Sequence, residues 1–151
     1  MTTRRIVATG TFDILHPGHL FYLEESRKLG DELVVIVARD TNVKHKPRPV
    51  IPEEHRLRMV AALKPVDRAV LGDISDMFRP IEELKPDVIT IGFNQMFDET
   101  RLADQLRARN LTPGVVRIGR CPDGDLCSSR LVVQRIIDKR SGDRHHPCDH
   151  S

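Results

Sequence analysis

The stretch that decides the fold is Ile6-Val7-Ala8-Thr9-Gly10-Thr11-Phe12-Asp13-Ile14-Leu15-His16-Pro17-Gly18-His19. A short apolar run ends in a glycine, and a helical pattern begins at Pro17. Proline suits the first helical position because the N–H that it lacks would have no intrahelical partner there. This order predicts a β-strand, a tight turn and a helix N-terminus. Unpaired N–H groups at such a helix end attract anions, phosphates among them.

Two histidines accompany this helix start. His16 and His19 lie three residues apart, so both imidazoles are expected on one side of the first helical turn. Imidazoles placed there can donate hydrogen bonds to phosphoryl oxygens, most strongly when a transition state gathers charge. Asp13, inside the turn, is expected to accept hydrogen bonds from local backbone N–H groups.

Length and charge narrow the class of protein. With 151 residues the chain is expected to form one domain. Its 24 basic and 22 acidic residues leave a net charge of +2, and aromatic residues make up 4%. This balance indicates neither a nucleic-acid surface nor a membrane surface, and no apolar run approaches the roughly 20 residues that cross a bilayer. We therefore expect neither nucleic acid nor a membrane as a partner.

The cysteines and the first residues favour a cytoplasmic location. Cys121, Cys127 and Cys148 are odd in number and include no Cys-x-x-Cys pair, which fits reduced thiols. Residues 1–5 lead directly into a strand-like segment and do not resemble a signal peptide.

Strand-like and helix-like segments alternate along the chain. Strands are expected at residues 6–9, 33–38, 68–72, 87–92 and 114–118, and helices at 17–29, 53–63, 80–84, 98–109 and 128–139. This alternation predicts an α/β fold, a Rossmann-like, doubly wound, five-stranded parallel sheet with helices on both faces. The domain is expected to cover residues 1–139, and the polar residues 140–151 are expected to form a disordered tail. The side chains expected to face the core are Leu20, Leu23 and Leu29 in the first helix and Leu57, Val60, Ala61 and Leu63 in the second.

In such sheets ligands bind beyond the carboxyl ends of the strands, where the strand order reverses. The glycine turn, Arg39–Asp40, the turn 92–95 and Gly119–Arg120 each follow an expected strand, so they are predicted to meet at one crevice.

Three further features could serve a phosphate there. The basic segment 44–48 contains Lys44 and Lys46 and is either a solvated loop or a lid over bound phosphates. Arg56 is either a phosphate partner or one half of a surface salt bridge with Glu53 or another nearby acid. The pair Ser128–Ser129 would cap the last helix in either case, and that helix end could also receive a phosphate.

These motifs, taken together, resemble a known family. Gly-Thr-Phe-Asp-x-x-His-x-Gly-His at 10–19, Glu-His-Arg at 54–56 and Arg120 followed by Ser128–Ser129 are similar to nucleotidyltransferases of the cytidylyltransferase type, the His-x-Gly-His superfamily. The likeness covers residues 5–138. Within the family the archaeal-type FAD synthases are most similar, on the segments 37–40, 43–44, 49–53, 63–67, 71–73 and 85–87.

The resemblance implies transfer of AMP from ATP to FMN, which gives FAD and pyrophosphate, with a divalent cation such as Mg²⁺ whose protein ligands the sequence does not identify. It implies catalytic roles for His16, His19, Lys44 and Arg120. It implies nucleotide contacts from Thr11, Phe12, His16, His19, Asn94, Ser128 and Ser129, and help with the phosphates from Lys46 and Arg56.

Two other functions stay open at this point. The same fold could act as a cytidylyltransferase on glycerol 3-phosphate or another phosphoalcohol. A nucleotide-sensing module without catalysis is a second alternative, although a pure binder gains little from groups suited to a transition state. The sequence does not report the oligomeric state, and a homodimer is kept open.

Overall fold

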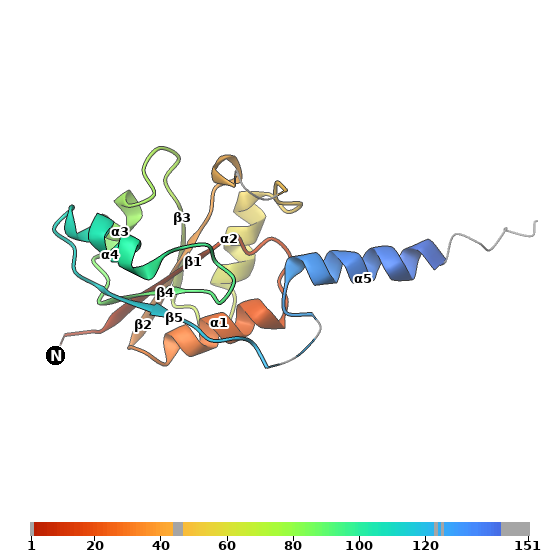
Figure 1. Cartoon of the computed structure of the whole chain (residues 1–151), viewed down its shortest axis with the longest axis horizontal. Helices are drawn as coiled ribbons and strands as arrows, with labels where there is room; N and C mark the ends of the chain where they lie inside the picture. The colour runs from red at the N-terminus through yellow and green to blue at the C-terminus, as the bar shows by residue number, and fades with distance from the viewer. Residues whose placement is uncertain (1, 44–46, 123, 125, 143–151) are drawn as a thin grey trace, which may run out of the picture.

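Five parallel strands form one sheet in the computed structural model, which describes residues 2–43, 47–122, 124 and 126–142 (Figure 1). The sheet has the order β3-β2-β1-β4-β5. Every pairing of neighbouring strands is parallel, which confirms the predicted sheet. The strands are β1 (Arg5–Gly10), β2 (Glu32–Val37), β3 (Arg68–Leu71), β4 (Val88–Ile91) and β5 (Gly114–Arg117).

Helices cover both faces of the sheet. The helical elements are α1 (Pro17–Arg27), the 3-10 turn η1 (Asp40–Asn42), α2 (Glu53–Ala61), α3 (Arg79–Leu84), α4 (Glu99–Arg107) and α5 (Ser129–Gly142). One apolar cluster joins β1 and β2 to Leu23 of α1 and Val60 of α2. A second cluster joins the other face to Leu84 of α3 and Leu106 of α4. Because β2 is covered on both faces, its run Leu33–Val37 is buried throughout.

The buried faces of α1 and α2 differ from the expectation. Leu20 of α1 is 40% exposed and Leu29, which follows the end of the helix, is 37% exposed, whereas Leu23 is fully buried. The buried face of α1 contains Tyr22 and Ser26 beside Leu23, and the hydroxyl groups of both residues bond to Thr90 of the sheet. In α2, Ala61 is exposed, whereas the charged residue Arg56 is buried together with Val60.

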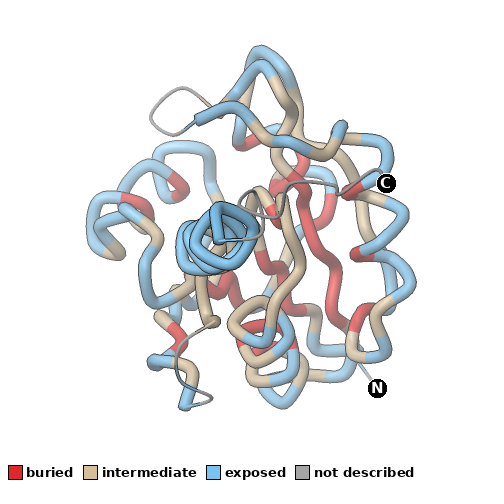
Figure 2. Tube along the Cα trace, turned by 90° about the vertical axis from the view of Figure 1, so that its right-hand side faces the viewer, coloured by how far each residue is buried: buried red, intermediate tan, exposed pale blue. Residues whose placement is uncertain are grey.

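The last helix is longer than expected. α5 continues to Gly142, past the predicted end at residue 139, and the remaining residues of the predicted tail, 143–151, lie outside the described part. The helix projects from the sheet in Figure 1 and points toward the viewer in Figure 2, where most of it is drawn exposed. None of its residues is buried. Within the described residues, no helix is both long and apolar enough to cross a membrane.

The direction of winding reverses between β1 and β4. Strands β2 and β3 extend the sheet on one side of β1, and β4 and β5 extend it on the other. A ligand crevice is therefore expected at the carboxyl ends of β1 and β4. The glycine turn after β1 lies at this edge and leads into α1.

Candidate functional site

The two histidines stack on each other at the start of α1. His16 is the N-cap residue, and Pro17 takes the first helical position as predicted. The ring centroids of His16 and His19 are 3.7 Å apart, with 24° between the ring planes. Both imidazoles therefore lie on one side of the helix start, as the spacing predicted.

The helix end is less open to anions than expected, because His16 caps it. The Nδ1 atom of His16 accepts hydrogen bonds from the N–H groups of Gly18 at 3.0 Å and His19 at 3.4 Å. Since Nδ1 accepts, the proton of a neutral His16 ring is on Nε2, which is then a donor. Burial lowers the pKa of His16 from its usual 6.5, so the neutral ring is favoured near pH 7. These two backbone N–H groups are therefore already paired with His16, and the prediction that the His16 ring contacts a phosphate stays a prediction.

The glycine turn packs an aromatic ring beneath the histidines. Phe12 has a positive φ of 55° and its side chain is buried. Its ring centroid is 5.2 Å from that of His19. A Cβ on Gly10 would stand 2.8 Å from the Phe12 ring, so only glycine fits below it. The Phe12 ring supports His19, and the predicted nucleotide contacts of Thr11 and Phe12 stay predictions.

A second helix N-terminus meets the first. A Cβ on Gly18 would stand 2.5 Å from the carbonyl oxygen of Cys127, which shows how closely the segment before α5 approaches α1. The hydroxyl of Ser128 accepts from the N–H of Leu131 at 3.2 Å, so Ser128 caps α5 as expected. The predicted phosphate site at Ser128–Ser129 is thereby placed beside the start of α1.

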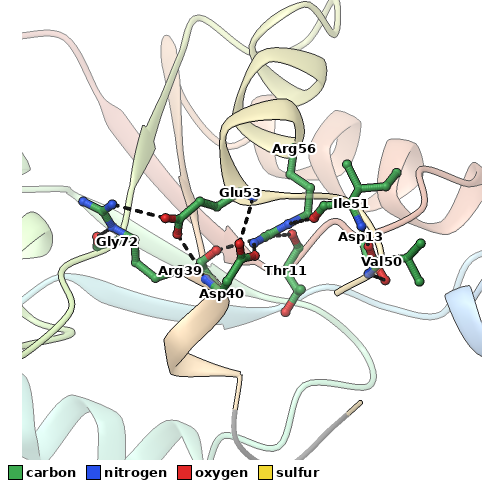
Figure 3. Close-up of polar contacts among 10 residues, drawn as sticks. Thr11, Asp13, Arg39, Asp40, Val50, Ile51, Glu53, Arg56 and Gly72 are labelled. Atoms are coloured by element: carbon green, nitrogen blue, oxygen red, sulfur yellow. Dashed lines mark hydrogen bonds and ion pairs between the residues drawn. The ribbon is translucent and has the colours of Figure 1, made fainter. Parts of the chain in front are cut away.

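Arg56 is a structural residue rather than an exposed phosphate ligand. Its side chain is 0% exposed. It donates to the carbonyl oxygens of Ile51 at 2.9 Å, Thr11 at 2.7 Å and Ala38 at 2.9 Å, and to Asp40 Oδ1 at 2.5 Å (Figure 3). These contacts use all three of its nitrogens, so the prediction that Arg56 assists the phosphates is not supported. The alternative, a salt bridge with a nearby acid, is confirmed with Asp40 as the partner, but the guanidinium is buried rather than at the surface.

The network around Arg56 ties three chain segments together. Figure 3 shows Asp13 beside Val50 and Ile51, whose N–H groups donate to its carboxylate at 3.0 and 2.9 Å. The partners of Asp13 are thus distant in sequence, and the prediction that it bonds within its own turn is wrong. Glu53 accepts from the N–H of Asp40 at 3.1 Å. These bonds fix the chain on both sides of the basic segment to the glycine turn.

The other predicted site residues are either exposed or outside the described part of the chain. Lys44 and Lys46 lie outside the described residues. Asn94 is exposed in the turn after β4. Arg120 is exposed and lines an open hollow of about 450 Å³ with Cys121, Pro122, Gly124 and Leu131. The Sγ atoms of Cys121 and Cys127 lie 2.7 Å apart at this hollow.

Sequence reasoning missed Arg117, which organises the turn after β4. Its guanidinium donates to the carbonyl oxygens of Gly92 at 3.0 Å and Gln95 at 2.9 Å, and it also contacts Phe97 and Glu99. The signal that could have identified it is a charged residue in the otherwise apolar run 115–118.

A doubly wound sheet whose switch point carries a stacked histidine pair and two converging helix N-termini is the architecture of a nucleotidyltransferase. The chain belongs to the cytidylyltransferase-like family, whose model matches residues 7–135. An FAD synthase from Methanoregula boonei is 69% identical over 145 residues, which are 95% of this chain and 98% of that protein. Another FAD synthase, from Methanosphaerula palustris, is 72% identical and covers 91% of this chain and 90% of its own length.

A solved structure shares the fold. It is described as a lipopolysaccharide core biosynthesis protein from Thermoplasma volcanium GSS1. The TM-score is 0.76 with 48% sequence identity, and the alignment covers 79% of this chain and 98% of the other.

Proposed function

We propose that this nucleotidyltransferase is an FAD synthase, which transfers AMP from ATP to FMN and releases FAD and pyrophosphate. The similarity to FAD synthases extends over nearly the whole chain and supports the choice of substrates. The stacked pair His16–His19 is the single structural observation that supports this chemistry, because two imidazole rings follow β1, beside the point where the strand order reverses.

The reaction needs positioning and charge stabilisation more than proton transfer. An oxygen of the FMN phosphate is already ionised near neutral pH and attacks the α-phosphorus of ATP. The new P–O bond forms as the bond to the β-phosphate oxygen breaks, and the electron pair leaves with pyrophosphate. Negative charge grows on the transferred group and the leaving group, so donors aimed at them stabilise the transition state.

His16 is suited to this role by its hydrogen bonds. Its Nδ1 atom is held by the N–H groups of Gly18 and His19, so its Nε2–H has a fixed direction. We place Nε2–H of His16 and the ring of His19 against the triphosphate, with Ser128 and Ser129 at the second helix end. Lys44, Lys46 and Arg120 are proposed to neutralise phosphate charge, and Asn94 to contact the nucleoside.

The divalent cation is proposed to enter with ATP rather than to reside in the protein. No group of three or more potential metal-ligating side chains occurs among the described residues. The carboxylates nearest the glycine turn are engaged, Asp13 by two N–H groups and Asp40 by Arg56. Mg²⁺ commonly binds through substrate phosphates and keeps several waters, so the Mg²⁺–ATP complex is the substrate that fits. EDTA is then expected to stop turnover without lowering the melting temperature.

The test is pyrophosphate release from ATP, measured with and without FMN, together with chromatographic detection of FAD. Release that requires FMN and matches the FAD formed is expected. Release with CTP and glycerol 3-phosphate but not with FMN would favour the cytidylyltransferase alternative. Nucleotide binding without any pyrophosphate would favour the sensing module. Light scattering tests the homodimer, and a nucleic-acid shift assay tests the expected absence of that partner.

A further inference from the structure

The two strands that flank the crevice part early. Backbone pairing of β1 with β4 ends at Ala8 and Thr90, whereas pairing of β1 with β2 continues to Gly10. The carboxyl ends of β1 and β4 therefore stand next to each other without ladder hydrogen bonds. Backbone groups at this point need other partners, because buried N–H and C=O groups are costly to leave unpaired.

Two side chains bridge the gap. The Tyr22 hydroxyl donates to the Thr90 carbonyl at 2.7 Å and accepts from the N–H of Thr9 at 3.2 Å. The Gln95 amide continues the series, because its Nε2 donates to the Thr9 carbonyl at 2.9 Å and its Oε1 accepts from the N–H of Gly92 at 2.7 Å. One glutamine thus replaces the next rung of the ladder.

The bridges differ in what they connect. Tyr22 is buried and belongs to α1, the helix that begins at the histidine pair. Gln95 is half-buried and belongs to the turn that carries Asn94. Arg117 holds the same turn from its other side through the carbonyl oxygens of Gly92 and Gln95. The position of the turn relative to α1 therefore depends on Thr9 and on the Gln95 amide.

We propose that Gln95 is a positioning residue that sets the spacing between the turn at residues 92–95 and the histidine helix, and so fixes the nucleoside of ATP relative to its phosphates. The inference rests on the proposed function. The turn contacts the nucleoside equally before and during the transfer, so losing the bridge weakens ATP binding uniformly. FMN, which reacts through its own phosphate, does not depend on this bridge.

The experiment compares Gln95→Met with a matched control, Gln105→Met, an exposed glutamine of α4. Methionine keeps the length of the side chain and removes both hydrogen bonds. We expect the KM for ATP to rise about tenfold, the scale of one or two neutral hydrogen bonds, with kcat and the KM for FMN changed less than about threefold. The control is expected to match wild type in all three constants.

A second variant guards against a folding failure. Gln95→Glu keeps the acceptor for Gly92 but, when ionised, cannot donate to the Thr9 carbonyl, so its KM for ATP should rise at least as much. An unchanged KM for ATP in both folded variants, or a lower kcat with that KM unchanged, would overturn the inference.

Failure of the proposed function can be distinguished from failure of the role inferred for Gln95. If wild type forms no FAD, calorimetric dissociation constants for ATP still compare Gln95→Met with Gln105→Met, and equal values sink the role of Gln95.

Discussion

Replacing Arg56 with methionine tests whether this residue stabilises the fold or binds a phosphate. The variant removes the four hydrogen bonds of a fully buried guanidinium, and the Asp40 carboxylate loses its ion-pair partner but keeps the hydrogen bond from the N–H of Glu53. Because Asp40 is 39% exposed, most of the loss comes from the three carbonyl oxygens left without their donor, and we expect about 3–5 kcal/mol of unfolding free energy. For a domain of this size that loss lowers the melting temperature by about 6–20 °C.

The assay is thermal and urea unfolding of Arg56→Met beside Arg58→Met, an exposed arginine of the same helix. The control should lie within about 0.5 kcal/mol of wild type. If Arg56→Met were as stable as Arg58→Met but bound ATP far more weakly, the network would not need its cation. Arg56 would then be a phosphate ligand after all, and the structural reasoning would fail.

Three further predictions concern the helix start. His16→Ala and His19→Ala should each lower kcat roughly 10²–10³-fold in the pyrophosphate assay, and near-normal turnover would remove that residue from catalysis. Gly18→Ala should lower kcat about 10²-fold, because its Cβ would stand 2.5 Å from the Cys127 carbonyl and force the two helix starts apart; unchanged kinetics would refute the close approach. Burial lowers the pKa of His16 below the unfolded value of 6.5, so its contribution to stability is present above pH 6.5 and is lost as the pH falls from there through the lower folded-state pKa. His16→Asn keeps a side-chain acceptor for the helix cap but has no titrating ring. Urea titrations should therefore show a smaller loss of unfolding free energy between about pH 7.5 and about pH 5.5 for this variant than for wild type.

Local sequence patterns predicted the helices and strands well. A strand that is buried on both faces of the sheet, for example, is a continuous run of apolar residues. The run Leu33–Val37 is buried throughout and forms β2 as expected. The helix start at Pro17 and the cap at Ser128 depend on backbone hydrogen bonds within a few residues. Both could therefore be predicted from the neighbouring sequence. The alternation of strands and helices predicted a doubly wound sheet but not the order β3-β2-β1-β4-β5, which comes from the structure.

Long-range polar contacts could not be predicted in the same way. Arg56 has the sequence context of a surface helix, and its burial depends on carbonyl groups up to 45 residues away. Asp13 likewise finds its partners 37 and 38 residues along the chain. The buried face of α1 includes Tyr22 and Ser26, whose hydroxyl groups bond to the sheet, and hydrophobic periodicity does not predict such contacts.

The meeting of α1 and α5 has an electrostatic consequence. Each helix start carries part of a positive charge, and the close packing of Gly18 on Cys127 sets the two side by side. Like charges brought together store repulsion in the ligand-free fold. A polyanion bound between the two helix starts would offset that repulsion, so we expect their close packing to favour such a ligand over a neutral one.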